Sequence, residues 1–230
     1  MNNSKIPLHI TIIPDGNRRW AISKGLDKLE GYSKVDYSYL ESLLLEAKKL
    51  GTKYISLWIF STENWKRSKI EINFLFNHFL KNVGKLLDGS LRNKIRIKHL
   101  GRKDRLPKKV IESLDLLESK TKSFDEFTVL LCLDYGGRDE IVRALNKALK
   151  SGISEIEEEN LSNYLDSAGI PDPDLIIRTS GEKRLSGFMP YQSVYSEFYF
   201  TDVHFPDFGP QQLREAVEEF SSRKRRFGSS

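Results

Sequence analysis

A carboxylate, a row of backbone amides and two guanidinium groups follow the first apolar run of this chain. After residues 9–13 the sequence reads Pro14-Asp15-Gly16-Asn17-Arg18-Arg19-Trp20-Ala21. Free N–H groups at the start of a helix attract anions, arginine binds phosphate through paired hydrogen bonds, and an aspartate beside them can hold a divalent cation that bridges phosphate oxygens. The segment therefore predicts a diphosphate site with Mg²⁺. Taken alone, the same residues also fit Asp15 as a helix N-cap and the two arginines as a solvated surface.

Two further apolar runs end in the same kind of polar sequence. Residues 55–60 lead into Ser61-Thr62-Glu63-Asn64-Trp65-Lys66-Arg67, and residues 174–177 lead into Arg178-Thr179-Ser180-Gly181-Glu182-Lys183-Arg184-Leu185-Ser186. Ligands of open α/β sheets bind at the carboxyl ends of the strands. Three such ends that carry arginine with small hydroxyl or glycine residues therefore predict the walls of one anion site.

The elements that must position these residues follow from the hydrophobic pattern. Short apolar runs alternate with longer amphipathic ones, which is typical of strand-helix units and a parallel sheet. Strands are expected at residues 8–13, 54–60, 95–100, 128–133, 175–177 and 197–200. Helices are expected at residues 40–50, 72–83, 107–119, 138–149 and 210–220, and Gly51 is placed to end the first of them. The predicted fold is one α/β domain, residues 1–230, with a mostly parallel central sheet of about six strands flanked by helices.

Composition narrows the class of partner without choosing among its members. A length of 230 residues suits one domain, and the net charge is +5, with a pI of about 9.1. The basic residues recur at the predicted anion site and in Arg223-Lys224-Arg225-Arg226. This balance favours acidic partners, namely diphosphates, anionic lipid headgroups or nucleic acid.

The compartment is predicted from cysteine usage and from apolar runs. The single cysteine, Cys132, lies in the apolar run 127–133 and is expected to be a small core residue, which excludes a disulfide framework. No stretch approaches the roughly 18 apolar residues of a membrane-spanning helix, and residues 1–7 lack the apolar region of a signal peptide. A cytoplasmic protein is expected, with association at the membrane surface as a further option.

Five segments together resemble the cis-prenyltransferase family, whose best-known member is undecaprenyl diphosphate synthase. They are the three segments above, Asp134-Tyr135-Gly136-Gly137-Arg138, and Tyr195-Ser196-Glu197-Phe198-Tyr199-Phe200-Thr201-Asp202. The resemblance runs in order from His9 to about Gly228. It implies an enzyme that elongates an allylic prenyl diphosphate with isopentenyl diphosphate, forms a cis double bond at each step and releases pyrophosphate.

The resemblance also implies roles for single residues. Asp15 matches an essential aspartate of metal and diphosphate chemistry, and Asn64 matches an asparagine that orients the substrate or relays the proton. Because an amide is a poor base, we expect Asn64 to position the substrate and released pyrophosphate to accept the proton. The residues expected around the allylic substrate are Gly16, Asn17, Arg18, Arg19, Trp20, Lys28, Ser61, Thr62, Glu63, Trp65 and Arg67.

Isopentenyl diphosphate is expected at a second subsite. Its diphosphate should meet Arg178, Arg184, Leu185 and Ser186, with Glu197 as a metal ligand in addition to Asp15. Residues 226–228 resemble a C-terminal element that can complete a neighbouring subunit's site, which implies a homodimer. The resemblance also implies an apolar tunnel between sheet and helices for the growing chain. Aromatic stripes are more often core than channel, and the aromatic residues in question are Trp58, Phe60, Phe74, Phe76 and Phe79.

Several positions depart from the family pattern. Tyr32 and Lys183 stand where histidines are usual, Lys28 stands where arginine is common, and Met189-Pro190 replaces an apolar-aromatic pair. A lysine cannot serve as a neutral metal ligand at pH 7, but it can bind diphosphate as a point charge. The departures therefore bear on substrate affinity and metal geometry rather than on the class of reaction.

Alternative functions stay open on the sequence alone. One is a short-chain or irregular prenyl diphosphate synthase, and another is a partner subunit without activity, although the presence of Asp15, Asn64 and Arg178 argues against the latter. A remote alternative is a basic nucleic-acid-binding protein, for which no motif is found. Because Trp58 and Ile59 are bulky neighbours on one strand, one of them must face the tail of the substrate. This predicts a short or medium product.

Overall fold

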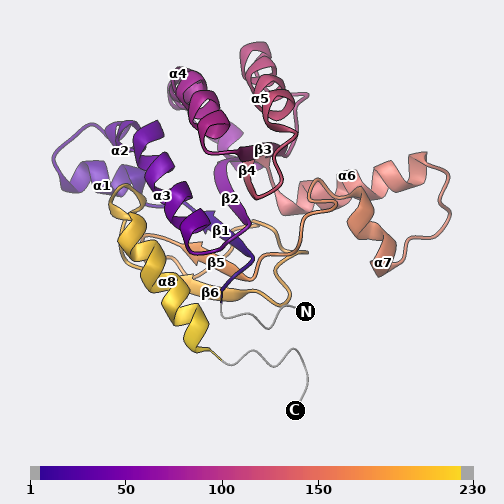
Figure 1. Ribbon diagram of the computed structural model, residues 1–230. Helices are drawn as coiled ribbons and strands as arrows, with labels where there is room; N and C mark the ends of the chain where they lie inside the picture. The colour runs from indigo at the N-terminus through magenta and orange to yellow at the C-terminus, as the bar shows by residue number, and fades with distance from the viewer. Residues whose placement is uncertain (1–5, 224–230) are drawn as a thin grey trace.

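Six parallel strands form the centre of the structure, a computed structural model that describes residues 6–223 (Figure 1). The strands are β1 (His9–Ile13), β2 (Tyr54–Ser61), β3 (Ile95–Leu100), β4 (Phe127–Tyr135), β5 (Leu175–Arg178) and β6 (Glu197–Phe200). Their order across the sheet is β3-β4-β2-β1-β5-β6. Every neighbouring pair is parallel. The predicted α/β fold is confirmed, and within the described range the sheet is wholly parallel rather than mostly so.

Helices join the strands from β1 to β5, because parallel neighbours cannot be joined by a tight turn; β5 and β6 are joined by a long segment without a helix. The helices are α1 (Asn17–Ser23), α2 (Glu30–Lys34), α3 (Tyr37–Lys49), α4 (Lys69–Arg92), α5 (Lys108–Thr121), α6 (Gly137–Lys150), α7 (Glu158–Leu161) and α8 (Pro210–Ser222). Short 3₁₀ turns occur at η1 (Thr62–Lys66), η2 (Ser162–Tyr164) and η3 (Phe205–Asp207). The strands and longer helices lie close to the predicted ranges, and Gly51 follows α3 with a φ of 94°, as expected of a glycine that ends a helix.

Helix α4 is the main difference in length from prediction. It has 24 residues, begins at the N-cap Ser68, whose side chain accepts a hydrogen bond from the N–H of Glu71, and continues well past residue 83. Glycine is unfavourable inside a helix, but Gly89 has a packing reason. A Cβ at this position would lie 1.4 Å from the hydroxyl oxygen of Tyr37 on α3. The apolar pattern alone does not reveal this close contact between the two helices.

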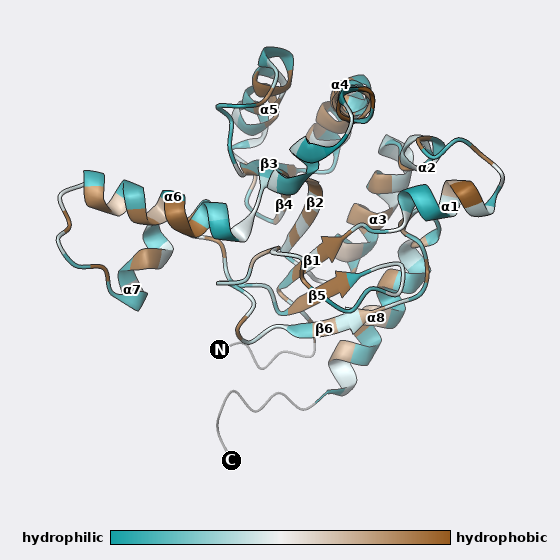
Figure 2. Ribbon diagram, turned by 180° about the vertical axis from the view of Figure 1, so that it is seen from behind, coloured by the Kyte–Doolittle hydropathy of each residue, from teal (hydrophilic) through white to brown (hydrophobic). Residues whose placement is uncertain are grey.

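Two hydrophobic layers cover the two faces of the sheet. One layer includes side chains from α3, α4, α5 and α8, packed on alternate residues of the strands, such as Ile10 and Ile12 of β1. The other is smaller and is built around Cys132, Phe188 and Met189. In Figure 2 the ribbons of β1 and β5 are strongly hydrophobic, as expected of strands covered on both faces. The prediction that Cys132 is a core residue is confirmed, since its side chain is buried.

The chain leaves β1 and β5 toward opposite faces of the sheet. β1 is followed by the helices up to α3, whose Leu43 and Leu44 belong to the larger layer. β5 is followed by a segment whose Phe188 belongs to the smaller layer. β1 and β5 are neighbours in the sheet. Such a divergence opens a crevice at the carboxyl ends of the two strands, which is where ligands of open α/β sheets bind.

Strands β2 and β4 each contain an extra residue near their carboxyl ends. A register shift between Trp58 and Phe60 leaves Ile59 without a partner on β4, and a second shift between Phe60 and Ser61 leaves Asp134 without a partner on β2. An extra residue reverses the alternation of side chains that follows it. Ile59 and Phe60 consequently both pack into the larger hydrophobic layer.

Two predictions concern the ends of the chain and membrane spans. The residues 226–228 that resemble a C-terminal family element lie outside the described residues, as do residues 1–5. Among the helices of the described range, none is long and apolar enough to cross a membrane.

Candidate active site

Asp15 lies just after the carboxyl end of β1, and its carboxylate is surrounded by donors. Oδ2 accepts a hydrogen bond from Nη2 of Arg178 at 2.9 Å, and Oδ1 accepts one from the N–H of Gly16 at 2.7 Å. Nη2 of Arg19 lies 3.2 Å from Oδ1. Burial would raise the pKa of Asp15, but the hydrogen bonds from Arg178 and Gly16 and the charges of both arginines outweigh it and lower the pKa. The carboxylate is therefore ionised at neutral pH.

The simpler interpretation of Asp15 as a helix cap is wrong. The N-cap of α1 is Gly16, in a left-handed conformation with a φ of 95° and without a side-chain cap. A Cβ on Gly16 would lie 2.4 Å from Oγ of Ser180 and 2.7 Å from Nδ1 of His204. These two side chains share a hydrogen bond of 2.7 Å behind the turn. Both the backbone conformation and the close packing thus require glycine, which leaves the carboxylate of Asp15 free to face the site.

Arg178 connects the end of β5 to Asp15 and to the segment that follows β5. Its side chain is only 5% exposed. Nη2 donates to Asp15, while Nη1 donates to Oγ of Ser186 at 2.8 Å and to the carbonyl oxygen of Arg184. Nε is buried and has no hydrogen-bond partner among the described residues. A buried donor on a cation is costly without an acceptor, so this guanidinium is suited to a bound anion.

Glu182 holds two arginines that come from different strand ends. Its Oε1 lies 3.3 Å from Nη1 of Arg19, and its Oε2 pairs with Nη1 of Arg184 at 2.5 Å. Both arginine side chains are about half exposed or more, at 46% and 61%. An incoming diphosphate could replace Glu182 as their partner. No role was predicted for Glu182, and only its position between Arg178 and Arg184 in the sequence could have suggested one.

A second acidic residue, Glu71 at the start of α4, holds arginines on the other side of the site. Nη1 of Arg67 lies 2.9 Å from Oε1 of Glu71, and Nη1 of Arg18 lies 3.8 Å from Oε2. Arg67 also donates to the hydroxyl of Tyr32 at 3.0 Å. Burial raises the pKa of Tyr32 despite the nearby charge of Arg67, so the phenol stays protonated at neutral pH. Tyr32, treated above as a departure from the family pattern, thus belongs to the arginine cluster; Glu71 was missed.

The turn η1 fixes the orientation of Asn64. The N–H of Ser61 donates to Oδ1 of Asn64 at 3.1 Å, while the Ser61 side chain accepts from the backbone N–H of Asn64. This reciprocal pair is a capping box. With Oδ1 engaged, the NH₂ group is the part of the Asn64 side chain that suits a ligand in the adjoining cavity.

A cavity of about 670 Å³ extends from these polar groups into the interior. Its mouth is lined by Asp15 and the arginines, and its deeper part lies between the sheet and two helices, lined by Leu44 of α3, Leu86 of α4 and Val129 of β4. Trp58, Phe60, Phe76 and Phe79, named above as candidate tunnel residues, line this cavity, whereas Phe74 does not line it and stacks on His78. The combination of a charged mouth and an apolar interior suits a ligand with an anionic head and a hydrocarbon tail.

The structure brings most of the predicted site residues to this cavity. Those that line it are Asp15, Gly16, Asn17, Arg18, Arg19, Ser61, Glu63, Asn64, Arg67, Arg178 and Ser186. Those that do not line it are Trp20, Lys28, Thr62, Trp65, Arg184 and Leu185. Trp65 packs behind Phe60, Arg184 borders the mouth through Glu182, and Leu185 packs into the smaller hydrophobic layer on the other face of the sheet. Lys28 is exposed.

Glu197 is not brought to Asp15. It begins β6 and is in register with Leu175, at the start of β5, whereas Asp15 contacts Arg178, at the end of β5. Three residues of strand correspond to about 10 Å. Glu197 instead pairs with Nη1 of Arg223 at 2.8 Å. Within one copy of the chain, the two residues expected as metal ligands therefore lie apart.

The residues present fit a metal that the substrate helps to hold. Among the described residues, no group of three or more His, Cys, Asp or Glu side chains could hold a metal ion by itself. Mg²⁺ commonly needs only one or two carboxylates when substrate phosphates and water complete its shell. The ionised, partly exposed carboxylate of Asp15, beside arginines suited to diphosphate, meets that requirement.

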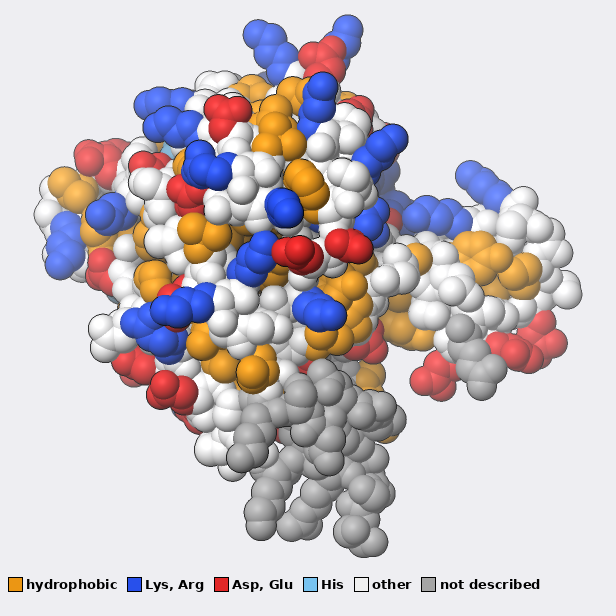
Figure 3. Space-filling view, in the orientation of Figure 1, with side chains coloured by type: hydrophobic (Ala, Val, Ile, Leu, Met, Phe, Trp, Pro, Cys, Tyr) orange, Lys and Arg blue, Asp and Glu red, His pale blue; other side chains and the backbone are white. Residues whose placement is uncertain are grey.

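On the face of the molecule shown in Figure 3, charge is mixed rather than gathered into one stripe. On the face shown in Figure 3, Lys and Arg side chains alternate with Asp and Glu and with apolar side chains over the described part of the chain. A nucleic-acid-binding surface is expected to form a continuous basic patch. This face therefore gives no support to the nucleic-acid alternative.

Comparison with known proteins gives consistent results across the whole chain. The family model described as "Putative undecaprenyl diphosphate synthase" matches residues 13–228. The chain is 42% identical to an isoprenyl transferase of Thermotoga maritima over 228 residues, covering 97% of each chain. It superposes with a TM-score of 0.93 on lavandulyl diphosphate synthase from Lavandula x intermedia, solved with dimethylallyl diphosphate, at 32% identity over 98% of this chain and 99% of that one. A probable undecaprenyl diphosphate synthase from Campylobacter jejuni gives a TM-score of 0.83 at 34% identity over 100% of both chains.

Proposed function

The chain belongs to the undecaprenyl diphosphate synthase family of prenyltransferases, and from that premise we propose how its residues divide the work of condensing two prenyl diphosphates. It is a cis-prenyltransferase. In this reaction the double bond of isopentenyl diphosphate attacks the carbon that carries the allylic diphosphate, pyrophosphate leaves, and a proton is then lost. The charge that develops on the leaving group is the main electrostatic problem. The single observation that carries the proposal is the Asp15–Arg178 contact at the mouth of an apolar cavity.

The allylic diphosphate is assigned to the side of the mouth formed by α1 and η1. The backbone N–H groups at the start of α1 and the guanidinium groups of Arg18, Arg19 and Arg67 would surround it. Glu71 and Glu182 keep these arginines in place before an anion arrives. Arginines fixed in advance stabilise the departing pyrophosphate without reorganisation during the reaction.

Isopentenyl diphosphate is assigned to the side formed by the end of β5. Arg178 and Ser186 share a hydrogen bond there, and the guanidinium of Arg184 is largely exposed beside them. The unpartnered Nε of Arg178 supports an anion at this place. Because Arg178 also contacts Asp15, the two diphosphates would be neighbours, which holds the reacting carbons close together.

Asn64 is assigned to orienting the substrate, and Mg²⁺ to a place at Asp15. The amide of Asn64 is held by Ser61, and an amide cannot take up the proton at neutral pH. Released pyrophosphate is the proposed proton acceptor. A bound Mg²⁺ would supply charge neutralisation of the leaving diphosphate. The ionised Asp15 is the residue that would hold it together with substrate oxygens.

The apolar cavity is assigned to the growing isoprenoid chain. Keeping the chain in the cavity removes apolar surface from water, at roughly 25 cal/mol per Å². Ile59 lines the cavity together with Phe60, and its β-branched side chain would limit the width there. We therefore expect a short or medium product.

Assembly and location are further parts of the proposal. The resemblance of residues 226–228 to an element that completes a neighbouring site supports a homodimer. The basic pI of about 9.1 supports contact with the anionic surface of a membrane, where an apolar product would be released. We propose a cytoplasmic enzyme, a fraction of which is bound at the membrane surface.

A short-chain or irregular synthase is the second candidate. The specific observation in its favour is the TM-score of 0.93 with lavandulyl diphosphate synthase. Against it stands the higher identity of 42% to an isoprenyl transferase. A partner subunit without activity is not favoured, because Asp15, Asn64 and Arg178 are all present at the cavity.

One experiment tests these assignments. The purified chain is incubated with isopentenyl diphosphate, Mg²⁺ and, separately, dimethylallyl, geranyl, farnesyl or geranylgeranyl diphosphate, and the products are read by mass spectrometry. A ladder of products that grows by isopentenyl units supports the main proposal. A single product from dimethylallyl diphosphate alone supports the second candidate. Absence of any product with all four primers would contradict both and favour a partner subunit.

A further inference from the structure

Asp134, the unpaired residue of β4 at the second register shift, is a buried carboxylate in an uncommon backbone conformation. Its side chain is fully buried. Its φ is 50°, in the left-handed region, which aspartate and asparagine tolerate better than most residues. Because it is the extra residue of β4, it has no partner on β2. A charge in such a position persists only where the surrounding structure fixes it.

Two side chains satisfy the carboxylate of Asp134. Nε of Arg105 donates to Oδ2 at 2.9 Å, and Nη2 of Arg105 donates to Oδ1. The indole Nε1 of Trp65 donates to the same Oδ1 at 2.8 Å. The guanidinium of Arg105 also lies over the Trp65 ring, 5.7 Å from its centre. One carboxylate thus fixes both an arginine and the tryptophan under it.

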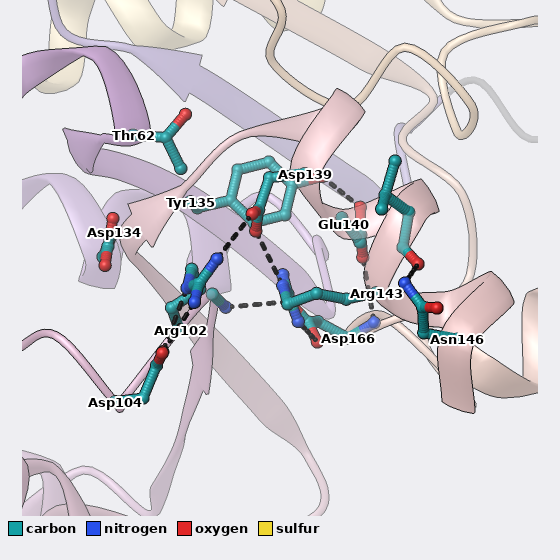
Figure 4. Close-up of polar contacts among 12 residues, drawn as sticks. Thr62, Arg102, Asp104, Asp134, Tyr135, Asp139, Glu140, Arg143, Asn146 and Asp166 are labelled. Carbon is teal, nitrogen blue, oxygen red and sulfur yellow. Dashed lines mark hydrogen bonds and ion pairs between the residues drawn. The ribbon is translucent and has the colours of Figure 1, made fainter. Parts of the chain in front are cut away.

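The loop that carries Arg105 is itself held against Asp134. The N–H of Arg102 donates to the carbonyl oxygen of Asp134 at 3.1 Å. The Arg102 side chain pairs with Asp104 and, at 3.0 Å, with Asp139 at the start of α6, as Figure 4 shows. A Cβ on Gly101 would lie 2.3 Å from the carbonyl oxygen of the residue before Asp134, so only glycine lets the loop approach this closely. Arg105 is therefore presented to Asp134 by a fixed loop.

Trp65 connects the carboxylate of Asp134 to the wall of the cavity. It belongs to η1, next to Asn64, and its ring packs against Phe60 at 5.2 Å and Phe76 at 5.7 Å between ring centres. Both phenylalanines line the cavity, whereas Trp65 does not. The indole therefore stands between the buried carboxylate and the cavity wall.

We propose that Asp134 is a positioning residue for the condensation. Through the indole of Trp65 it fixes the turn that carries Asn64 and the aromatic wall beside the reacting carbons. The inference rests on the proposed function, in which η1 forms the allylic wall. A displacement of about 1 Å at a reacting centre can cost roughly 100-fold in rate, so the loss of this contact should appear in kcat.

The test is a double-mutant cycle between Asp134→Asn and Trp65→Phe. Asparagine tolerates the left-handed conformation and keeps the size of the side chain, but it removes the charge that pairs with Arg105. We expect kcat to fall about ten- to 100-fold, with little change in the KM for isopentenyl diphosphate, whose assigned residues lie at the end of β5. In the Trp65→Phe background, Asp134→Asn should cause almost no further loss, because its effect passes through the indole.

A spectroscopic readout and a matched control separate positioning from stability. With 5-fluorotryptophan in the three tryptophans, the ¹⁹F resonance that disappears in Trp65→Phe is that of Trp65. It should shift or broaden in Asp134→Asn. Glu46→Gln removes a partly buried carboxylate that pairs with Arg214 at 2.8 Å, away from the cavity. It should lower the melting temperature without changing kcat.

The outcomes distinguish the inference from the proposed function. If wild-type protein condenses the substrates but Asp134→Asn keeps its kcat, or if the two losses multiply independently, the inference is overturned while the function stands. If wild-type protein forms no product with any primer, the proposed function fails first. Should Asp134→Asn not fold, Arg105→Lys replaces it, since lysine keeps the charge but loses the paired hydrogen bonds and the stacking. Its loss of kcat must likewise vanish in the Trp65→Phe background.

Discussion

The carboxylate of Asp15 and the guanidinium of Arg178 lie 2.9 Å apart, although the residues are 163 positions apart in the sequence. They meet because β1 and β5 are parallel neighbours whose carboxyl ends lie at the same edge of the sheet. The contact lowers the pKa of Asp15 and links the two proposed diphosphate subsites. A change in either residue should therefore affect both metal-dependent chemistry and substrate binding.

Replacement of Asp15 by alanine should reduce turnover about 100- to 1000-fold, as expected from the loss of one charged contact in the transition state. The fold should persist, because the carboxylate is partly exposed and makes no core contact. Turnover is measured as a function of Mg²⁺ concentration, and folding by circular dichroism. Asp15→Asn separates charge from size, because it keeps the size of the side chain and removes its charge. It should be similarly impaired. Near-normal Mg²⁺-dependent turnover by either variant would contradict the assignment.

Arginine variants should separate the two subsites. Arg184→Ala should raise the KM for isopentenyl diphosphate, and Arg19→Ala that for the primer, each roughly tenfold, since a hydrogen bond to a charged group contributes about 1.5 kcal/mol or more. Arg178→Ala should chiefly weaken the binding of isopentenyl diphosphate. It should also lower kcat, because it leaves Asp15 without its partner. The matched control is Arg214→Ala, a half-exposed arginine paired with Glu46 away from the cavity. If the KM values of both substrates rose equally in all of the site variants, the division into two subsites would be wrong.

The strands and the charged edge could be predicted from sequence because they depend on local pattern. β3 and β6 were predicted with the boundaries observed, and the three polar segments after β1, β2 and β5 do meet at one cavity. Parallel pairing forces their carboxyl ends together, so the residues after those ends become neighbours whatever the details of packing. This explains why Asp15, Asn64 and Arg178 were found.

The remaining parts depend on contacts that no local pattern reveals. Glu71 and Glu182 become counterions only because the arginines fold against them. Asp134 can be recognised as a functional candidate only from the two register shifts in β2 and β4. Glu197 was predicted as a metal ligand from a motif, but its register with the start of β5 places it toward the other end of the strands from Asp15. Register is fixed by packing of the whole sheet rather than by the residues of one segment.

Stability should fall between pH 6.5 and pH 4 because of His9. Burial lowers the pKa of His9 from 6.5 to about 4, outweighing the hydrogen bond to the carbonyl oxygen of Pro171. Above pH 6.5 the folded and unfolded states are both neutral at this residue. Below it, the unfolded chain binds a proton that the folded chain excludes, so the free energy of unfolding falls by up to about 3 kcal/mol as the pH reaches 4.

Urea denaturation at a series of pH values measures this dependence. His9→Gln keeps a donor for Pro171 but cannot titrate, so its free energy of unfolding should vary less between pH 6.5 and 4 than that of the wild type. Burial also lowers the pKa of His99, which adds a dependence of the same sign that both proteins share. Parallel pH profiles for wild type and His9→Gln would contradict the prediction.

The length of the product should depend on Ile59. The register shift in β2 turns Ile59 toward the larger hydrophobic layer next to Phe60, and both residues line the cavity. Packed interiors yield little, so a β-branched side chain near the mouth limits the width available to the first isoprene units. Ile59→Ala removes that side chain beyond Cβ. The distribution of products, read by mass spectrometry with farnesyl diphosphate as primer, should shift to longer chains.

The matched control for this shift is Ile111→Ala. Ile111 is a half-buried isoleucine on α5 that packs against the same hydrophobic layer but does not line the cavity. Its replacement should destabilise the protein by a similar mechanism, the loss of apolar contact, and leave the product distribution unchanged. A longer product in both variants would point to general loosening of the layer. A lengthening confined to Ile59→Ala would assign the limit on chain growth to the width of the cavity at β2. An unchanged distribution, or a wild-type enzyme that already makes undecaprenyl or longer chains, would contradict the prediction.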